Sequence, residues 1–511
     1  FILSFMKWSA KLLAPFSRVS NQTVESFIRL ETADDDTTLV AEDGSLVSYL
    51  KIDGSRQIIG QEEYNHLIES STVKLGARFD RRGHGLQVYF CRNPKRAYQM
   101  TSEMVEPSRS SSRSIGLEME DLFEERSRHL ARFISHEECY FVLWTRPSIL
   151  SKSDLDRAAK QSRNTKWVPA GNAQHPMAAI EALRARHKSY VLGTLSALDE
   201  LGIRSDLMET HDALNAVRAN LFPERANQGW RACLPGDPIP VRAADTTADF
   251  SDILWPPLGQ QIAGGNARVV NDHIVQIGQN IWSGVDITLA PMDPSPFPML
   301  LNRLLDANVP YRMSFLVESG GAEGTAAKSS IASILGFSNP SNKQIKNSLE
   351  ALQALARSEP VVKLRVSLAT WAPADKMNLL EDRVSTLMQA VESWGYCQVS
   401  NISGDPLECV MSSAMGIACA STAPAAVAPM IDVMRMLPWQ RPSSPFNKGS
   451  IMLRTPDGKI WPYQTGSAMT TTWFDLIFAQ PGAGKSVLMN SLNLGTCLAA
   501  GLNQLPFIAI I

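Results

Sequence analysis

The residues around Lys485 have the types and spacing of a phosphate-binding loop. Residues 479–486 read Ala-Gln-Pro-Gly-Ala-Gly-Lys-Ser, close to the pattern G-x-x-x-x-G-K-[ST]. In that pattern the backbone N–H groups of a glycine-rich turn surround phosphate oxygens, the lysine reaches the β- and γ-phosphates, and the hydroxyl ligates Mg²⁺. Gly482, Gly484, Lys485 and Ser486 supply these parts, and Ala479 stands where the first glycine usually lies. The pattern predicts a site for ATP and Mg²⁺.

The residues predicted to contact the nucleotide run without interruption through the loop into the following helix. Ser486 is the predicted Mg²⁺ ligand because its hydroxyl follows the lysine directly. The predicted nucleotide-binding residues are Gln480, Pro481, Gly482, Ala483, Gly484, Lys485, Ser486 and Val487. Trp461 and Tyr463, shortly before the loop, are weighed as adenine-stacking residues, although hairpin packing explains them more simply.

The segments around the loop must hold it in place. The apolar run Trp473 to Phe478 predicts a buried strand, and apolar residues at helical spacing from Val487 to Leu498 predict a helix that ends near Gly501. Phe507 to Ile511 predicts a second buried strand. A helix that begins directly after a strand and a glycine turn presents its N-terminus to an anion.

Hydrolysis of ATP requires groups that the sequence after the loop does not contain. A phosphate-loop ATPase also needs an acidic residue for the Mg²⁺ shell and a group that orients the attacking water, normally on later strands. No Asp, Glu or Arg follows Ser486, and residue 1 is Phe rather than Met. We therefore expect a fragment of a longer ATPase, cut at both ends and inactive by itself, whose catalytic acidic and arginine residues lie beyond Ile511.

Composition limits the remaining function classes. The chain has 511 residues, 44% hydrophobic and 20% charged, as in folded globular proteins rather than disordered ones. The net charge of −2 gives no strong nucleic-acid signal, since extended nucleic-acid binders usually carry a basic excess. Seven scattered cysteines without a C-x-x-C pair favour reduced thiols over a zinc or disulfide framework. His129 and His136 flank a charged helix end and are predicted to lie at the surface.

Two segments raise the question of membrane contact. Residues 1–15 form a basic amphipathic pattern before Pro15, which indicates peripheral binding to a membrane or a partner, or a helix folded onto its own domain. Residues 410–431 carry no charge but are dominated by small residues and contain Pro424 and Pro429. They are predicted to form a small-residue packing helix with a broken end rather than a membrane span.

The region before the loop alternates strands and helices in two groups of β-α-β-α-β order. The first group has strands at 46–52, 86–91 and 140–144 and helices at 61–75 and 117–133. The second group has strands at 311–317, 361–371 and 396–402 and helices at 341–352 and 375–395. The groups predict two α+β subdomains of ferredoxin-like type, before a hairpin built around Asp457-Gly458. A serine-rich loop is predicted at Ser108 to Ser114, and Pro438 to Pro445 is predicted to be a separating connection. The expected domains are 1–16 (amphipathic segment), 17–150 (first α+β subdomain), 151–265 (mainly helical), 266–440 (second α+β subdomain) and 441–511 (start of the ATPase domain).

A long α+β region, a hairpin with Asp-Gly and a late phosphate loop together resemble the type IV secretion and conjugation ATPases of the TraC/TrbE class. The loop region from Phe478 to Asn490 is most similar to the DotO/IcmB and TraU branch. Only the loop is specific at the level of single residues. The resemblance implies that residues 441–511 contain the first β-α-β unit of a RecA-like P-loop domain and that the ATPase assembles as a homo-hexamer.

The resemblance also implies a role and a place in the cell. The protein would be a bacterial cytoplasmic ATPase, peripheral at the inner membrane, that energises assembly of a secretion or conjugation apparatus, or protein or DNA transfer through it. Its partners would be other proteins of that apparatus. Two alternatives stay open: a hexameric DNA-pumping coupling ATPase, and a non-enzymatic assembly or docking module formed by this chain.

Overall fold

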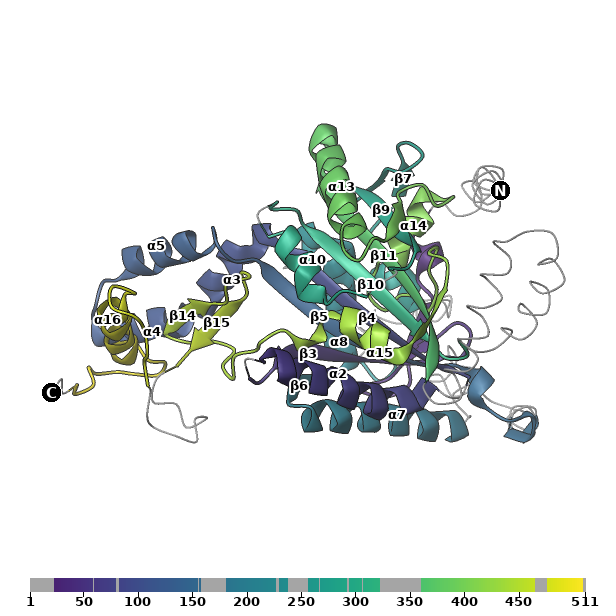
Figure 1. Ribbon diagram of the computed structural model, residues 1–511, viewed down its shortest axis with the longest axis horizontal. Coiled ribbons are helices and arrows are strands. Elements are labelled where there is room, and N and C mark those ends of the chain that lie inside the picture. The colour runs from purple at the N-terminus through teal and green to yellow at the C-terminus, as the bar shows by residue number, and fades with distance from the viewer. Residues whose placement is uncertain are drawn as a thin grey trace, which may run out of the picture.

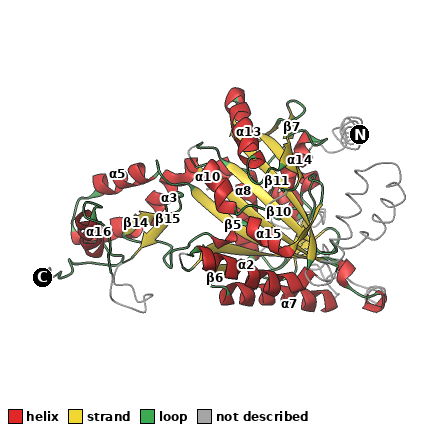
Figure 2. Ribbon diagram, viewed as in Figure 1, coloured by secondary structure: helices red, strands yellow, loops and turns green. Residues whose placement is uncertain are grey.

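A large antiparallel sheet with helices on both faces forms the body of the protein (Figures 1 and 2). The computed structural model describes residues 23–57, 59–79, 82–154, 156–157, 181–226, 229–237, 256–265, 267–291, 294–305, 307–321, 360–464 and 476–508. The sheet has 13 strands, and the strand order along it is β1-β2-β3-β5-β4-β10-β11-β9-β8-β7. The predicted α+β class is therefore confirmed for the region before the phosphate loop.

The first half of the sheet is built by one run of strands and helices. β6 and β5 flank β3, and β5 in turn pairs with β4, every pair antiparallel. The hairpin β1–β2 extends the sheet from β3. The elements of this half are β1 (Leu30–Ala33), β2 (Leu39–Ala41), β3 (Leu46–Ser55), α2 (Gln61–Gly76), β4 (His84–Asn93), β5 (His136–Thr145), α7 (Glu181–Glu200), β6 (Ile203–Leu207) and α8 (Thr210–Leu221).

The second half repeats this arrangement. β12 and β11 flank β9, β11 pairs with β10, and the hairpin β7–β8 extends the sheet from β9. The elements are α9 (Leu258–Ile262), β7 (Ala267–Val269), β8 (Val275–Ile277), β9 (Asn280–Leu289), α10 (Phe297–Arg303), β10 (Tyr311–Glu318), β11 (Val361–Pro373), α13 (Met377–Glu392), β12 (Gln398–Ser400), α14 (Pro406–Ser412), β13 (Ala426–Pro429) and α15 (Met430–Met436).

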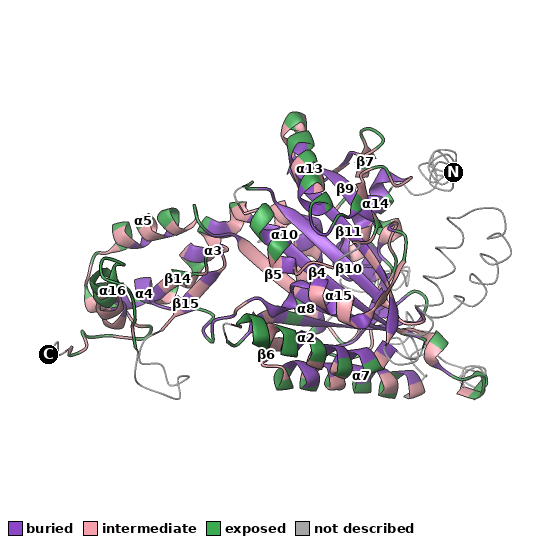
Figure 3. Ribbon diagram, viewed as in Figure 1, coloured by how far each residue is buried: buried purple, intermediate pink, exposed green. Residues whose placement is uncertain are grey.

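The two halves meet where β4 pairs with β10. The register is unbroken from Tyr311↔Arg92 to Glu318↔Gly85. Both strands are buried on both faces, which explains their nearly continuous apolar sequences. Val88 and Phe90 of β4 enter the core beneath α2, α10 and α13, whereas Tyr89 faces the core beneath α8 and α14. Figure 3 shows this burial concentrated in the central strands.

A smaller lobe projects from one end of the sheet (Figure 1). Three helices inserted between β4 and β5 form one part of it, and the hairpin and α16 that follow the second half form the other. Its elements are α3 (Ala97–Met104), α4 (Glu106–Ile115), α5 (Glu120–Leu130), β14 (Ile451–Arg454), β15 (Ile460–Tyr463) and α16 (Lys485–Cys497). Short 3₁₀ turns complete the described structure: Val24–Phe27, Ala77–Phe79, Pro94–Arg96, Pro147–Ile149, Pro223–Arg225 and Pro438–Gln440.

Two predictions before the phosphate loop are wrong, each because tertiary contacts override local composition, and a third segment is a connection as predicted but is more buried than expected. The serine-rich segment Ser108 to Ser114 belongs to helix α4, where Ser108, Ser111 and Ser112 are buried. Residues 410–431 form the end of α14, turns and β13 instead of one packing helix. The proline-rich connection from Pro438 to Pro445 is largely buried, including Trp439 and Arg441. The predicted amphipathic helix at 1–15 and a helix predicted from Ser341 to Leu352 lie outside the described residues.

Candidate nucleotide-binding site

The predicted phosphate loop adopts a tight turn at the N-terminus of α16. Gly482 and Gly484 have φ angles of 83° and 87°, in the left-handed region that glycine enters without a steric cost. The backbone N–H of Ala483 donates to the carbonyl of Gln480 over 3.2 Å, which closes the turn. Among the described residues, no atom beyond the adjacent positions lies within 4 Å of the place that a Cβ would take at either glycine.

Lys485 folds back over this turn. Its Nζ donates to the carbonyl oxygens of Ala479 at 2.7 Å and of Gln480 at 3.4 Å. The ammonium group is therefore held beside the loop by the backbone of the loop itself. A single positive charge fixed in this way provides the electrostatic attraction that a triphosphate needs.

The first turn of α16 adds backbone N–H groups, which also attract negative charge. The N–H of Leu488 bonds to the carbonyl of Gly484 over 3.0 Å and starts the helical ladder. The N–H groups of the preceding residues at a helix start have no intrahelical acceptor, and they carry the positive end of the helix dipole. Ser486 lies within this turn, exposed like Gln480 to Val487. The eight predicted site residues are thus together on one exposed loop and helix start.

The strands expected on either side of the loop are not formed in the described residues. Residues 476–478 are irregular, with Leu476 79% and Phe478 87% exposed, and residues 507–508 are also irregular, with Phe507 96% exposed. The strand prediction is wrong there because a buried strand needs hydrogen-bonded neighbours, and no described strand lies beside these segments. Residues 473–475 and 509–511 lie outside the described residues.

The far end of α16 is anchored to the lobe. Leu494 and Leu498 pack with Val105 and Phe123 of the inserted helices. The hydroxyl of Ser111 in α4 donates to the carbonyl of Ala499 over 2.7 Å, which satisfies a backbone acceptor just beyond the end of α16. The buried serines of α4 thus have a structural role that the composition alone did not reveal.

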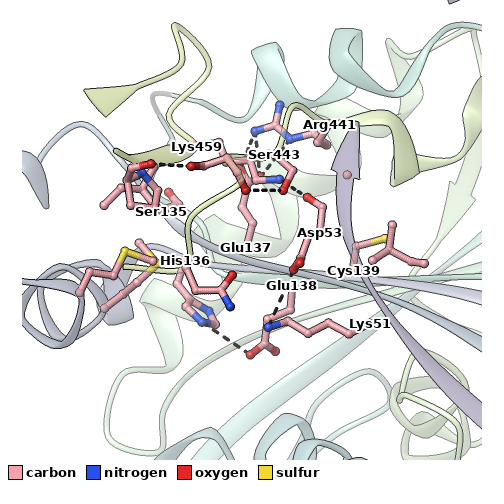
Figure 4. Close-up of a pocket in the computed structure, with 18 of the residues that line it drawn as sticks. Lys51, Asp53, Ser135, His136, Glu137, Glu138, Cys139, Arg441, Ser443 and Lys459 are labelled. Atoms are coloured by element: carbon pink, nitrogen blue, oxygen red, sulfur yellow. Dashed lines mark hydrogen bonds and ion pairs between the residues drawn. The ribbon is translucent and has the colours of Figure 1, made fainter. Parts of the chain in front are cut away.

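A second polar cluster joins the hairpin to the first half of the sheet (Figure 4). Arg441 donates to both carboxylate oxygens of Glu137, at 2.8 and 3.0 Å, and also contacts Asp457. The side chains of Arg441 and Glu137 are only 6% and 5% exposed. Burial opposes the charge on Arg441, but Glu137 and Asp457 outweigh it and raise the pKa of the guanidinium. These residues form the hairpin clasp.

Backbone contacts strengthen the hairpin clasp. The N–H of Ser55 donates to the carbonyl of Arg441, and the N–H of Ser443 donates back to Ser55, both over 2.7 Å. Lys459 Nζ donates to the carbonyl of Asp53 over 2.6 Å. Burial lowers the pKa of Lys459 to about 8, with Glu137 acting in the opposite direction.

Sequence reasoning found the hairpin but missed the hairpin clasp. The turn signal Asp457-Gly458 correctly predicted two paired strands, and Gly458 has a φ of 83°. The partners Glu137 and Arg441 are 304 positions apart, and nothing in the local spacing connects them. His136, predicted at the surface, is only 15% exposed, and burial lowers its pKa against the opposing effect of Glu138. Tyr463 packs edge-on against Phe446 with ring centroids 5.7 Å apart, as hairpin packing predicts.

Other kinds of site receive no support from the part of the chain that the structure describes. No group of three or more His, Cys, Asp or Glu side chains there is placed to hold a metal ion. The seven cysteines carry free thiols. No described helix combines the length and apolar character needed to cross a bilayer.

Comparison with known proteins does not add to this description. No protein-family model matches the chain, and no curated protein matches its sequence.

Proposed function

We propose that the loop from Gln480 to Val487 binds the phosphates of Mg²⁺-ATP. The observation that carries the proposal is the combination of two left-handed glycines with a lysine held over the same turn. The glycines keep side chains away from the loop backbone, and Lys485 and the helix start supply positive charge. The residues present fit a triphosphate, with Ser486 as the residue that would ligate Mg²⁺.

The biological role that we propose is that of a type IV secretion or conjugation ATPase of the TraC/TrbE class. Support comes from the order of parts: a large α+β region, a hairpin and then a phosphate loop. The strand order β6-β3-β5-β4 and its repeat β12-β9-β11-β10 is that of two ferredoxin-like units with inserted segments, which agrees with a docking region that precedes the ATPase core. In this proposal the loop opens a RecA-like domain, and homo-hexamer assembly at the bacterial inner membrane belongs to the protein as a whole.

A docking module is the second candidate function for residues 1–511. The extensive buried core before residue 465 favours it, because that region folds around its own sheet while the phosphate loop is exposed. This role is compatible with the first, since nucleotide binding and docking use different parts of the chain. Hydrolysis needs an acidic residue for the Mg²⁺ shell, normally on a strand that follows the loop, and residues 487–511 contain no Asp or Glu. We therefore expect binding without turnover.

Binding of a fluorescent ATP analogue to residues 1–511, with Mg²⁺ present, tests the first proposal. We expect Lys485→Ala to weaken binding roughly 10- to 100-fold, since a charge-assisted hydrogen bond to phosphate is lost. Lys188→Ala, at an exposed lysine of α7, is the matched control and should leave affinity unchanged. Equal affinity of the wild type and the Lys485→Ala variant would disprove the phosphate-loop assignment.

Pull-down of apparatus components with residues 1–511 tests the docking role separately. Lys485→Ala should bind these components as well as the wild type does, because the loop lies apart from the folded sheet region. If the pull-down fails while ATP still binds, the docking role is wrong and the nucleotide site stands.

A further inference from the structure

A cavity of about 360 Å³ lies between the hairpin and the end of the sheet in the first half (Figure 4). Its walls come from β3, β5, helix α3 and the chain from Pro438 to Pro462. This volume is within the range of roughly 300–1,000 Å³ that is usual for small-molecule sites. None of the phosphate-loop residues lines it.

The carboxylates of the cavity wall already have partners. Both oxygens of Glu137 accept from Arg441. Asp53 lies 3.3 Å from Arg204, and Glu138 lies 3.6 Å from both Arg96 and His136. Glu137, Asp53 and Glu138 are thus engaged with basic groups of the protein itself, and Glu103 accepts from the side-chain amide of Gln99 over 2.8 Å.

The Lys459 ammonium of the same wall is not matched in this way. Lys459 Nζ makes one hydrogen bond, to the backbone carbonyl of Asp53, and no carboxylate in the described residues lies within 4.0 Å of it. A protonated lysine has three N–H donors, so two remain for a ligand. Unmatched donors in a cavity wall call for an acceptor such as a carboxylate.

Apolar side chains line one part of the cavity. Met100 and Met104 of α3 pack against Ile460 of the hairpin in that part of the lining. Methionine side chains can rearrange around ligands of different shape because they are unbranched and flexible. A ligand with an apolar body would therefore gain contact area here, while its polar group reaches Lys459.

We propose that this cavity binds a small carboxylate with a compact apolar body, its carboxylate on the Lys459 ammonium and its body against Met100 and Met104. Because the cavity walls belong to both the hairpin and the first half of the sheet, bound ligand would join the two across the hairpin clasp. The site is distinct from the phosphate loop in residues and in ligand class.

Benzoate is the probe for this site, and benzamide, of the same shape without charge, is its control. We expect benzoate to raise the melting temperature of residues 1–511 and to bind, by calorimetry, roughly tenfold or more tightly than benzamide. Lys459→Met should remove the preference for benzoate, and Lys188→Met, at an exposed lysine, should retain it.

A pH series on the wild type gives an independent readout if Lys459→Met fails to fold. Benzoate affinity should fall as the pH rises from 7 to 10, because the ammonium loses its proton, whereas benzamide binding should stay constant. Absence of a benzoate-induced shift, equal binding of benzoate and benzamide, or unchanged benzoate binding by a folded Lys459→Met variant would each overturn the proposal.

Discussion

The guanidinium carbon of Arg312 lies 4.5 Å from the centre of the Trp282 ring, inside the core of the sheet. Arg312 is 1% exposed and has no carboxylate within 4.0 Å in the described residues. Its three nitrogens donate instead to Ser413 Oγ at 2.8 Å and to the carbonyls of Asn220 and Val410 at 3.0 and 2.9 Å. These carbonyls lie near the C-terminal ends of α8 and α14, where the helix dipole is negative.

We expect Arg312→Met to lower the free energy of unfolding by about 3 kcal/mol or more. The substitution removes the side-chain donor to the Asn220 carbonyl and one of the donors to the Val410 carbonyl, and it removes the stacking on Trp282. Urea unfolding monitored by circular dichroism would measure the change. Arg113→Met, at a side chain that is 66% exposed, is the control and should cost less than about 1 kcal/mol. Equal stability of the two variants would contradict the role assigned to Arg312.

Breaking the hairpin clasp should also be costly. Glu137→Gln leaves Arg441 buried with Asp457 as its remaining carboxylate partner, and we expect a loss of roughly 2–4 kcal/mol in unfolding free energy. Hydrogen exchange should show the faster opening locally, at the amides of β14 and β15. The double variant Glu137→Leu with Arg441→Met should recover part of the loss, because no unpaired charge then stays buried. A double variant less stable than the sum of both single changes would argue against this reasoning.

His187 should make stability depend on pH in a defined window. The ring is buried and lies between Ser48 Oγ, 2.9 Å from Nε2, and Thr145 Oγ1, 2.8 Å from Nδ1. Ser48 donates its own proton to the carbonyl of Thr37, so Nε2 must be the ring donor and Nδ1 the acceptor. Burial lowers the pKa of His187 to about 4.

The sign of this effect follows from proton binding. In the unfolded chain the ring titrates near pH 6.5, so between pH 6.5 and 4 the unfolded state binds a proton that the folded state does not. The contribution of His187 to the free energy of unfolding is fully present above pH 6.5. It falls by up to about 3 kcal/mol as the pH approaches 4. Unfolding of the wild type and His187→Gln between pH 4 and 8 would test this. The variant should lose that part of the pH dependence, and identical profiles would contradict the prediction.

Sequence patterns predicted the strands and helices whose apolar residues recur at a regular period. β3, α2, β4, β5, β10, β11 and α13 all lie where their periodicity placed them. These elements are decided by local alternation of buried and exposed positions, which a single sequence records. The joining of the two groups through β4 and β10 was not predictable, since the partners Gly85 and Glu318 are far apart in the chain and both strands look equally apolar.

The residues of the candidate sites also divide into those that local sequence predicts and those that only long-range contacts bring together. The phosphate loop is a contiguous motif, so its residues could be named from the sequence, and they lie together on one turn. The cavity beside Lys459 brings together residues from Lys51 to Pro462, and no local pattern marks them. The loop prediction for the segment that forms α4 was wrong for a related reason. The serines of α4 are buried by contacts such as that from Ser111 to Ala499, 388 positions away.

The continuous register between β4 and β10 has a mechanical consequence. A force applied at the hairpin enters the sheet through Ser55 and Glu137, on β3 and β5. That force loads the antiparallel ladders to β4 and β10 in shear, so that many hydrogen bonds side by side must break together. We therefore expect the sheet to resist deformation under force. The lobe that carries α16, attached at the edge of the sheet, should be displaced more easily than the strands.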